Sequence, residues 1–258
     1  GGQQVMRFLV FQHIAVEHPG VMRDFMAADG TAWDVVELDR GETIPASLDG
    51  YDAMLVMGGP MDVWEESRLP WLAREKQAIR QWVVDRGAPF LGICLGHQLL
   101  ADALGGTVGP MARPEVGICH VSQTEMGRRD RLFAGLEASF PCLQWHGAEV
   151  KALPPGAVIC ADDAGGAIQA FRCGAWAYGL QFHVEITAAT VPEWAAVAAY
   201  RQSLERTMGH DGLVRLESAA RAALPAINTV GERIYSQFAA AARQYAARHA
   251  NHAAKART

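Results

Sequence analysis

Cys94 lies in a segment whose glycine spacing is typical of a nucleophilic residue. A short apolar run precedes it and a helical pattern follows it, in Pro89-Phe90-Leu91-Gly92-Ile93-Cys94-Leu95-Gly96-His97-Gln98. Gly92 and Gly96 match the Gly-x-Ser-x-Gly nucleophile elbow, a strand-to-helix turn with no room for Cβ atoms. A helix N-terminus favours a thiolate, and the Leu95 amide would be free to stabilise an oxyanion. A buried structural cysteine between packing glycines is the alternative, so partners elsewhere must decide.

A thiol nucleophile needs a base, and the base needs a group that orients it. Of the nine histidines, His183 stands out because it lies in Phe182-His183-Val184-Glu185, at the end of the last predicted strand. Residues two apart project from the same face of a strand, so Glu185 could fix the tautomer of His183. A surface pair is the alternative for so short a motif.

Three further segments could line a site around this cysteine. Gly58-Gly59-Pro60 ends a predicted strand, where the Gly59 N–H could approach a ligand or the glycines could form an ordinary turn. Gln98 lies one helical turn after Cys94, so its amide could hold a polar substrate group. The turn expected at Trp145-His146-Gly147-Ala148 could form a pocket wall. For His146 a binding or structural role is preferred over that of a second base.

Strands and helices alternate in the first part of the chain. Apolar runs predict strands at 6–13, 33–38, 51–57 and 89–93, and helical spacing predicts helices at 20–28, 70–86 and 95–104. This alternation predicts right-handed βαβ crossovers and a mainly parallel sheet. Because reactive groups lie beyond the carboxyl ends of such strands, Cys94, His183 and Gly59 would meet at one edge.

The pattern changes beyond residue 107. Short β-like segments predict added antiparallel strands at 116–125, 140–146, 156–161, 166–172 and 176–184. From about residue 188 an Ala-rich helical sequence follows, with breaks expected near Gly209–Gly212 and at Pro225. We therefore expect a domain at 5–187 and a helical extension at 188–258. Its apolar side chains could form a docking surface or cap the domain's own core; they are Trp194, Leu204, Leu213 and Leu216.

Composition excludes several classes of function. The 258 residues are half hydrophobic and carry a net charge of −5, with no basic cluster, so nucleic acid is not an expected partner. No apolar run approaches the ~20 residues of a membrane span, and the N-terminus lacks a signal-peptide pattern, so we expect a cytoplasmic protein with no membrane partner. The five cysteines are widely spaced without a Cys-x-x-Cys pair, which predicts neither a disulfide framework nor a zinc site.

Taken together, these segments resemble the class I (triad) glutamine amidotransferases. The resemblance covers roughly residues 5–187: Gly58-Gly59-Pro60 is similar to the family's oxyanion strand, Gly92–Gln98 to its nucleophile signature, and Phe182–Glu185 to its closing Phe-His-Pro-Glu motif. It implies a flavodoxin-like three-layer α/β sandwich with a mostly parallel central sheet. It also implies hydrolysis of the glutamine side-chain amide through a γ-glutamyl thioester, without metal or cofactor.

The resemblance also implies a role for each motif residue. Cys94 would be the nucleophile, His183 the base and Glu185 its orienting group, with the Gly59 and Leu95 amides as the oxyanion hole. Substrate binding would fall to Gly58, Gln98, Trp145, His146, Gly147 and Ala148. Two residues depart from the family pattern: Val184 replaces the usual proline, and Met61 follows Gly-Gly-Pro. We expect the first to alter rigidity more than chemistry and the second to alter contacts with the substrate head.

The motifs are most similar to the amidotransferase part of GMP synthetase, but no Gly-rich phosphate loop is present in this sequence. One hypothesis is therefore a free-standing glutaminase that delivers ammonia to a separate synthetase. A second is a self-sufficient hydrolase or transferase of γ-glutamyl compounds that uses the same thioester. A third is a binding-only relative with a decayed site, which the complete set of Cys94, His183 and Glu185 argues against.

Overall fold

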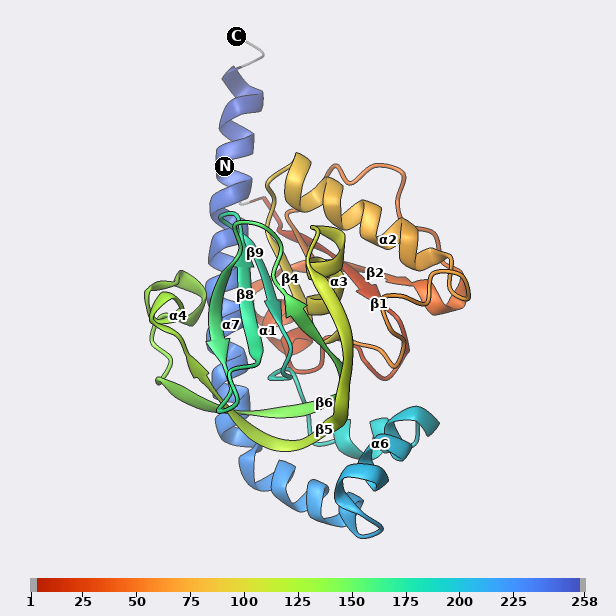
Figure 1. Cartoon of the computed structure of the whole chain (residues 1–258). Helices are drawn as coiled ribbons and strands as arrows, with labels where there is room; N and C mark the ends of the chain where they lie inside the picture. The colour runs from red at the N-terminus through yellow and green to blue at the C-terminus, as the bar shows by residue number, and fades with distance from the viewer. Residues whose placement is uncertain (1–3, 256–258) are drawn as a thin grey trace.

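The computed structural model describes residues 4–255, and within them the backbone forms one mixed sheet of nine strands (Figure 1). In chain order the strands are β1 (Arg7–Gln12), β2 (Ala32–Glu37), β3 (Ala53–Val56), β4 (Phe90–Ile93), β5 (Thr107–Gln123), β6 (Ser139–Ala152), β7 (Val158–Asp162), β8 (Ile168–Cys173) and β9 (Ala177–Leu180). Their spatial order is β2-β1-β3-β4-β9-β8-β7-β5-β6.

The sheet has a parallel half and an antiparallel half, which meet at β9. Strand β9 pairs parallel with β4 and antiparallel with β8. The pairs from β2 to β4 are parallel, and those from β8 to β6 are antiparallel. Because the carboxyl ends of parallel strands share one edge, the loops after β1, β3, β4 and β9 meet there.

Helices cover both faces of the parallel half. Helices α2 (Trp71–Arg80) and α3 (Leu95–Ala103) pack on one face, whereas α1 (Met22–Asp29) and the long α7 (Gly212–Lys255) pack on the other. The shorter helices are α4 (Glu125–Arg129), α5 (Thr190–Ala195) and α6 (Ala198–Met208). The three layers, the added antiparallel strands and the C-terminal helical segment confirm the predicted fold class.

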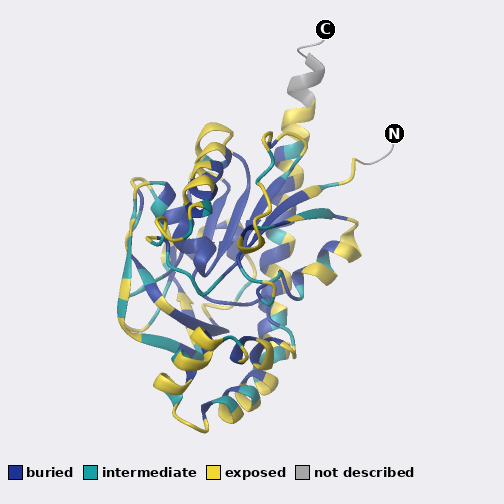
Figure 2. Ribbon diagram, turned by 90° about the vertical axis from the view of Figure 1, so that its right-hand side faces the viewer, coloured by how far each residue is buried: buried dark blue, intermediate teal, exposed yellow. Residues whose placement is uncertain are grey.

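Strand β1 shows how the sequence fills both cores. Phe8 and Val10 belong to the core beneath α1 and α7, whereas Leu9 and Phe11 belong to the core beneath α2 and α3. Successive side chains point to opposite faces of a strand, so a sheet covered on both faces needs a continuous apolar run. In Figure 2 the central strands are mostly buried, while the outer sides of the helices are exposed.

Some predicted elements have other bounds. The helix expected at 70–86 is α2 followed by a π-helical turn, Gln81–Asp85. The segment expected at 116–125 is the end of the longer β5, which stops at Gln123, and the segment expected at 140–146 lies within the longer β6. The break near Gly209–Gly212 is confirmed, because α6 ends at Met208 and α7 begins at Gly212.

The break expected at Pro225 is wrong. Helix α7 continues through this proline, and Figure 1 shows that its lower and upper parts run in different directions. A proline removes one helical hydrogen bond and crowds the preceding turn, so it bends a helix that packing holds in place rather than ending it.

The C-terminal helices pack inward. Trp194, Leu204 and Leu216 are buried in the same core as Phe8, and Leu213 packs against it. These four side chains therefore cap the domain's own core, and the docking role considered for them is wrong. His210 and His249 also lie in this helical segment, whereas the side chain of His252 is outside the described residues.

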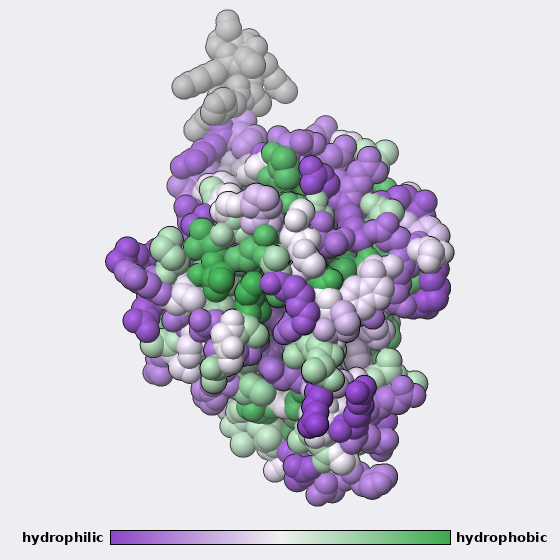
Figure 3. Space-filling view, viewed as in Figure 1, coloured by the Kyte–Doolittle hydropathy of each residue, from purple (hydrophilic) through white to green (hydrophobic). Residues whose placement is uncertain are grey.

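The surface mixes polar and apolar groups. Figure 3 shows apolar atoms gathered over the part of the sheet labelled β8 and β9 in Figure 1, within a largely polar face. Of the helices in residues 4–255, none combines the length and apolarity needed to cross a membrane.

Gly231 sets how closely α7 approaches the segment that contains His183. A Cβ at Gly231 would lie 2.3 Å from the Val184 carbonyl oxygen. Alanine gains about 1 kcal/mol over glycine from helix propensity. We predict that Gly231→Ala nevertheless lowers the free energy of unfolding, by about 1–3 kcal/mol, because the backbone of α7 must shift.

Chemical denaturation would measure this change. Glu232→Ala, at the exposed neighbouring position, should stay within about 0.5 kcal/mol of the wild type. A Gly231→Ala protein as stable as the wild type would contradict the close approach of α7.

Candidate active site

Cys94 occupies a strained position between β4 and α3. Its φ and ψ are 54° and −103°, and it is the one non-glycine residue with positive φ in the described part of the chain. The Cys94 N–H donates to the Leu180 carbonyl of β9, and its own carbonyl accepts from the Gln98 N–H. Residues persist in such regions only where the surrounding structure fixes them, typically at functional sites.

The two flanking glycines make this turn possible. A Cβ at Gly92 would lie 2.4 Å from the Gly96 carbonyl oxygen, and one at Gly96 would lie 2.1 Å from the Val56 carbonyl oxygen of β3. The start of α3 therefore packs directly on β3 and β4. This close backbone packing is the property that the Gly-x-Cys-x-Gly spacing predicts.

His183 and Glu185 form a buried pair at the same edge. His183 Nδ1 lies 2.9 Å and 3.1 Å from the two carboxylate oxygens of Glu185. Since a carboxylate accepts, Nδ1 donates, which directs Nε2 to the side of Cys94, and Cys94 and His183 interact closely enough to shift one another's pKa. His183 Nε2 is buried and has no other hydrogen-bond partner within the described residues.

The backbone reason for this pairing differs from the predicted one. Strand β9 ends at Leu180, so His183 does not belong to a regular strand. It forms an isolated bridge with Leu143 of β6, with N–H to carbonyl distances of 3.0 Å and 2.9 Å. The bridge keeps the chain extended, and the imidazole and carboxylate two residues apart still meet.

Burial and neighbouring charges set the pKa values of His183 and Cys94. Burial by itself lowers the pKa of His183, but the Glu185 carboxylate and Cys94 outweigh it and hold that pKa well above its usual value. Burial raises the pKa of the Cys94 thiol, and His183 only partly opposes this. The helix N-terminus alone therefore does not produce the thiolate, and the thiol depends on His183 as the acceptor of its proton.

Aromatic residues from the C-terminal segment cover the His183 side of the site. The ring of Trp194, in α5, lies edge-on to His183 with centroids 4.7 Å apart, and its Nε1–H donates to the Val16 carbonyl at 2.9 Å. Trp145 contacts both Trp194 and Tyr200, and its Nε1–H donates to the Tyr200 carbonyl at 3.2 Å. Helices α5 and α6 thus shield the imidazole from water.

A cavity of about 230 Å³ opens at Cys94. The predicted site residues among its lining are Gly59, Cys94, Leu95, Gln98, Trp145, His146, Gly147 and Ala148. The N–H groups of Gly59 and Leu95 find no hydrogen-bond acceptor within residues 4–255. Two unpaired N–H groups beside a thiol can donate hydrogen bonds to a bound carbonyl oxygen and stabilise the negative charge that develops on it.

Gln98 links three parts of the site. Its Nε2 donates to the Ala148 carbonyl at 3.0 Å and to Gln181 Oε1 at 3.1 Å. Gln181 Nε2 in turn lies 3.6 Å from Cys94 Sγ. Gln98 therefore braces the cavity wall through its own side chain, and Gln181 is a site contact that the sequence analysis did not single out.

The turn expected at Trp145–Ala148 is wrong, because these residues lie within β6. They pair with β5, and the irregularity falls on β5, where the register shifts between Pro110 and Glu115. His146 Nδ1 lies 2.8 Å from the Ala148 carbonyl oxygen, and its Nε2 lies 3.9 Å from Glu115 Oε1. These contacts agree with a structural or binding role for His146.

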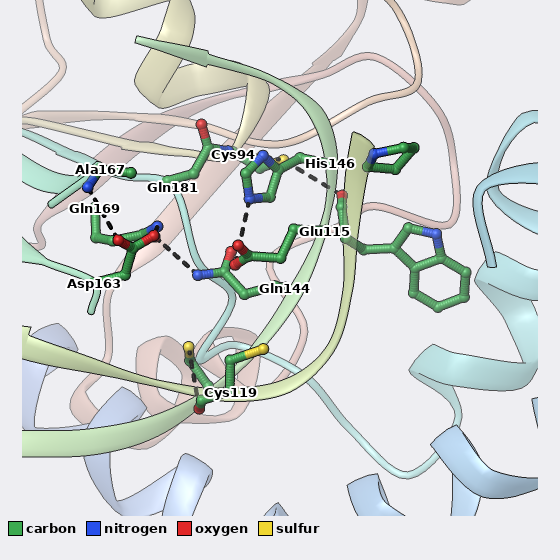
Figure 4. Close-up of polar contacts among 12 residues, drawn as sticks. Cys94, Glu115, Cys119, Gln144, His146, Asp163, Ala167, Gln169 and Gln181 are labelled. Atoms are coloured by element: carbon green, nitrogen blue, oxygen red, sulfur yellow. Dashed lines mark hydrogen bonds and ion pairs between the residues drawn. The ribbon is translucent and has the colours of Figure 1, made fainter. Parts of the chain in front are cut away.

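Buried amides continue from the cavity wall toward the surface (Figure 4). Gln144 donates to Gln169 at 2.8 Å, and Gln169 donates to Asp163 at 3.2 Å. Figure 4 shows these hydrogen-bonded side chains, Gln144, Gln169 and Asp163, beside Gln181 and His146. Within the described residues, no group of three or more His, Cys, Asp or Glu side chains is arranged to hold a metal ion.

Glu17 is a second buried carboxyl group at this edge, which the sequence analysis did not single out. It follows β1 in the loop that leads to α1, and the Tyr200 hydroxyl of α6 donates a hydrogen bond to it. Burial raises the pKa of Glu17 to about 7, although His183 and the Tyr200 hydrogen bond oppose this. Its position after a parallel strand is the one sequence signal that could have identified it.

The fold and the site together define an α/β protein with a cysteine at a nucleophile elbow and a His–Glu pair beside it. The family model for class I glutamine amidotransferases matches residues 23–193. The chain belongs to this family.

Individual relatives agree with this family. The chain is 31% identical to the glutamine amidotransferase-like protein YfeJ of Salmonella typhimurium over 188 residues, 72% of this chain and 78% of that protein. It is 38% identical to a GMP synthase of Thermomicrobium roseum over 133 residues, 52% of this chain but 23% of that protein. It is also 35% identical to one of the subunits of a glutamine-hydrolysing GMP synthase of Sulfurisphaera tokodaii, over 54% of this chain and 70% of that one.

Solved structures resemble most of the chain, including its C-terminal segment. A glutamine amidotransferase from Thermotoga maritima superposes with a TM-score of 0.80 and 29% identity, covering 92% of this chain and 99% of that one. A glutamine amidotransferase from Methylobacillus flagellatus also gives a TM-score of 0.80, with 26% identity and coverage of 92% and 96%.

We predict that the buried Glu17 makes stability depend on pH. The folded-state pKa of Glu17, about 7, exceeds its ordinary value of 4.5. The folded protein therefore binds the proton more tightly, and this stabilisation is lost as the pH rises from 4.5 through 7. Glu17→Gln should have a free energy of unfolding on the order of 3 kcal/mol above that of the wild type at pH 8, and so a higher melting temperature, and should match it near pH 4.5.

Thermal unfolding at both pH values measures the difference. Glu232→Gln, at an exposed position, should show no such pH-dependent difference. An equal offset between Glu17→Gln and the wild type at both pH values would contradict the raised pKa.

Proposed function

We propose that this protein hydrolyses γ-glutamyl amides, with glutamine as the first candidate substrate, through a thioester on Cys94. In this proposal His183 is the base, Glu185 orients it, and the N–H groups of Gly59 and Leu95 form the oxyanion hole. The observation that carries the proposal is the buried Cys94, His183 and Glu185 set at one sheet edge, beside two unpaired amides. Membership of the class I family supports the same chemistry.

Acylation follows from this arrangement. His183 takes the proton of the Cys94 thiol as the sulfur attacks the amide carbon, and negative charge develops on the amide oxygen between Gly59 and Leu95. The imidazolium then gives its proton to the amide nitrogen, the carbon–nitrogen bond breaks, and ammonia or an amine leaves. Glu185 keeps the proton of Nδ1 in place, so Nε2 remains the group that transfers protons.

Deacylation reverses the roles. His183 Nε2 removes a proton from water, which attacks the thioester carbon through a second oxyanion in the same hole. The carbon–sulfur bond breaks, the thiol regains its proton from His183, and a free γ-carboxylate remains. Both half-reactions thus use the same base and the same two amides.

The destination of the nitrogen distinguishes two forms of this function. The relatives named as subunits of glutamine-hydrolysing GMP synthases support a glutaminase that passes ammonia to a synthetase partner. The cavity supports a self-sufficient γ-glutamyl hydrolase or transferase, because Ala199, Tyr200 and Ser203 of α6 add a wall that could hold a larger leaving group. In either form, we propose residues 5–187 as the amidotransferase domain and 188–258 as an extension that completes its cavity; the last three residues lie outside those described.

Cys94→Ser should reduce γ-glutamyl hydrolysis by at least about 10³-fold, because a serine hydroxyl does not supply a thiolate-like nucleophile to this site. Ammonia or amine release measures the loss. Cys119→Ser, at a half-buried position opposite Cys142 in β5 and β6, should retain activity. A glutamine-like chloroketone should label the wild type once, at Cys94 by mass spectrometry. Unchanged hydrolysis in Cys94→Ser would refute the assignment.

A substrate screen separates the two forms. With glutamine and a set of γ-glutamyl peptides and amines, an ammonia-delivering glutaminase should hydrolyse glutamine slowly alone and faster with its synthetase. A self-sufficient enzyme should instead release glutamate from a γ-linked compound faster than from glutamine, without a partner. Faster turnover of a γ-glutamyl peptide than of glutamine would exclude the ammonia-delivering form.

A further inference from the structure

A buried ion pair lies directly behind the Gly58-Gly59 segment and takes no part in the triad. His13 follows β1, and Glu75 lies in α2; both side chains are fully buried. His13 Nε2 lies 2.5 Å and 2.9 Å from the two carboxylate oxygens of Glu75. Trp71 stacks on the imidazole with ring centroids 5.7 Å apart. Burying two charges costs free energy, so this ion pair is not explained by stability alone.

The other nitrogen of His13 contacts the backbone of the proposed oxyanion hole. His13 Nδ1 lies 3.1 Å from the Gly58 carbonyl oxygen. A carbonyl oxygen only accepts, so Nδ1 carries a proton and donates it. Nε2 faces the two carboxylate oxygens of Glu75, which accept, so Nε2 carries a proton as well. Burial alone lowers the pKa of His13, but Glu75 outweighs it and raises the pKa above its usual value.

The Gly58 carbonyl and the Gly59 N–H belong to the same peptide group. No peptide bond in residues 4–255 is cis, and in a trans peptide the carbonyl and the N–H point in opposite directions. Holding the carbonyl on one side therefore fixes the N–H on the other. Glycine permits wide rotation of this peptide, so without such a contact its orientation would be free to change.

Packing restricts the same peptide from the side. A Cβ at Gly59 would lie 2.9 Å from His13 Cβ and 3.2 Å from Leu95 Cδ2. His13 thus contacts the Gly58-Gly59 segment through both its ring and its Cβ. The Gly59 N–H has no acceptor within the described chain, and Gly59 lines the same cavity as Cys94.

We propose that His13, held by Glu75, is a positioning residue that orients and polarises the Gly58–Gly59 peptide, so that the Gly59 N–H stabilises the oxyanion. This inference rests on the proposed γ-glutamyl hydrolysis and adds residues that touch neither substrate nor nucleophile. When the carbonyl of a peptide group accepts a hydrogen bond from a cation, the group is polarised, and its N–H becomes a stronger hydrogen-bond donor. Both acylation and deacylation pass through an oxyanion, so the pair acts on kcat whichever step limits the rate.

The test compares hydrolysis with a reaction of Cys94 that forms no oxyanion. The double variant His13→Phe/Glu75→Leu replaces the ion pair by apolar side chains, a change that buried pairs often tolerate. With glutamine and γ-glutamyl-p-nitroanilide as probes, we expect kcat to fall about 10²–10³-fold, the loss typical of one oxyanion donor, with KM nearly unchanged. Alkylation of Cys94 by iodoacetamide, which only displaces iodide, should keep its wild-type rate.

Glu75→Gln provides a second variant if the double variant does not fold. It keeps the shape of the pair but removes the negative charge, and kcat should fall about tenfold or more with the alkylation rate unchanged. Tyr178→Phe is the stability control. It removes a buried hydrogen bond of 2.7 Å from the Tyr178 hydroxyl to Asp130, and this bond does not belong to the cavity. It should lower the melting temperature and leave kcat unaltered.

Three results would overturn the inference. Wild-type kcat in the folded variants would show that the pair does not act on the oxyanion. A parallel loss of alkylation and hydrolysis would show that it supports the thiol or the fold instead. A wild-type protein that hydrolyses neither probe, alone or with a synthetase, would refute the proposed function itself and this inference with it.

Discussion

The close approach of three backbone segments beneath Cys94 determines where every other group of the site can lie. Gly96 touches the Val56 carbonyl of β3, and Gly92 touches the Gly96 carbonyl. These contacts bring the start of α3 against β3 and β4, which forces Cys94 into a positive φ that costs on the order of 1–3 kcal/mol. Two hydrogen bonds of its own backbone help to hold it there. Because α3 starts beside β3, the amide of Leu95 comes to lie close to the end of that strand, where Gly59 follows.

Buried charge is the second constraint on this edge of the sheet. Three buried carboxyl groups surround it, and each has a partner that makes burial tolerable: Glu185 has His183, Glu75 has His13, and Glu17 has the Tyr200 hydroxyl. Desolvation strengthens the attraction within each pair and makes an unpaired charge expensive. The aromatic side chains of α5 and α6 that exclude water therefore also strengthen the electrostatics of the site. The C-terminal segment therefore contributes to the surroundings of the site as well as to the core.

The sequence predicted the parts of this protein that depend on local pattern. The elbow was recognisable because both glycines that its close backbone packing requires lie within five residues of sequence. The central strands were recognisable because continuous apolar runs fit a sheet covered on both faces. The spacing of two residues predicted the His183–Glu185 pair. The backbone is extended there because of the bridge to Leu143, however, and not because the pair lies in a regular strand. The roles of these residues remain predictions.

What the sequence could not predict depends on contacts between distant segments. His13 and Glu75 are 62 residues apart, and Glu17 and Tyr200 are 183 apart; nothing local marks either pair. Pro225 was misjudged because local propensity favours a break, whereas the core beneath α7 holds the helix together. The turn expected at Trp145–Ala148 failed similarly, since pairing with the long β5 keeps those residues in a strand.

The same distant contacts bear on the difference between the two forms of the proposed function. Up to the thioester, the chemistry of a glutaminase and of a γ-glutamyl hydrolase is the same, so the triad carries no information about the leaving group. That information lies in what the cavity presents beyond the amide nitrogen. Here the wall includes residues of α6, and Tyr200 in that wall is tied to Glu17 near Cys94 and His183. In the proposed function, a leaving group that contacts α6 would therefore contact a helix coupled to the electrostatics around Cys94 and His183. Selection among leaving groups would then depend on the C-terminal segment more than on the nucleophile elbow.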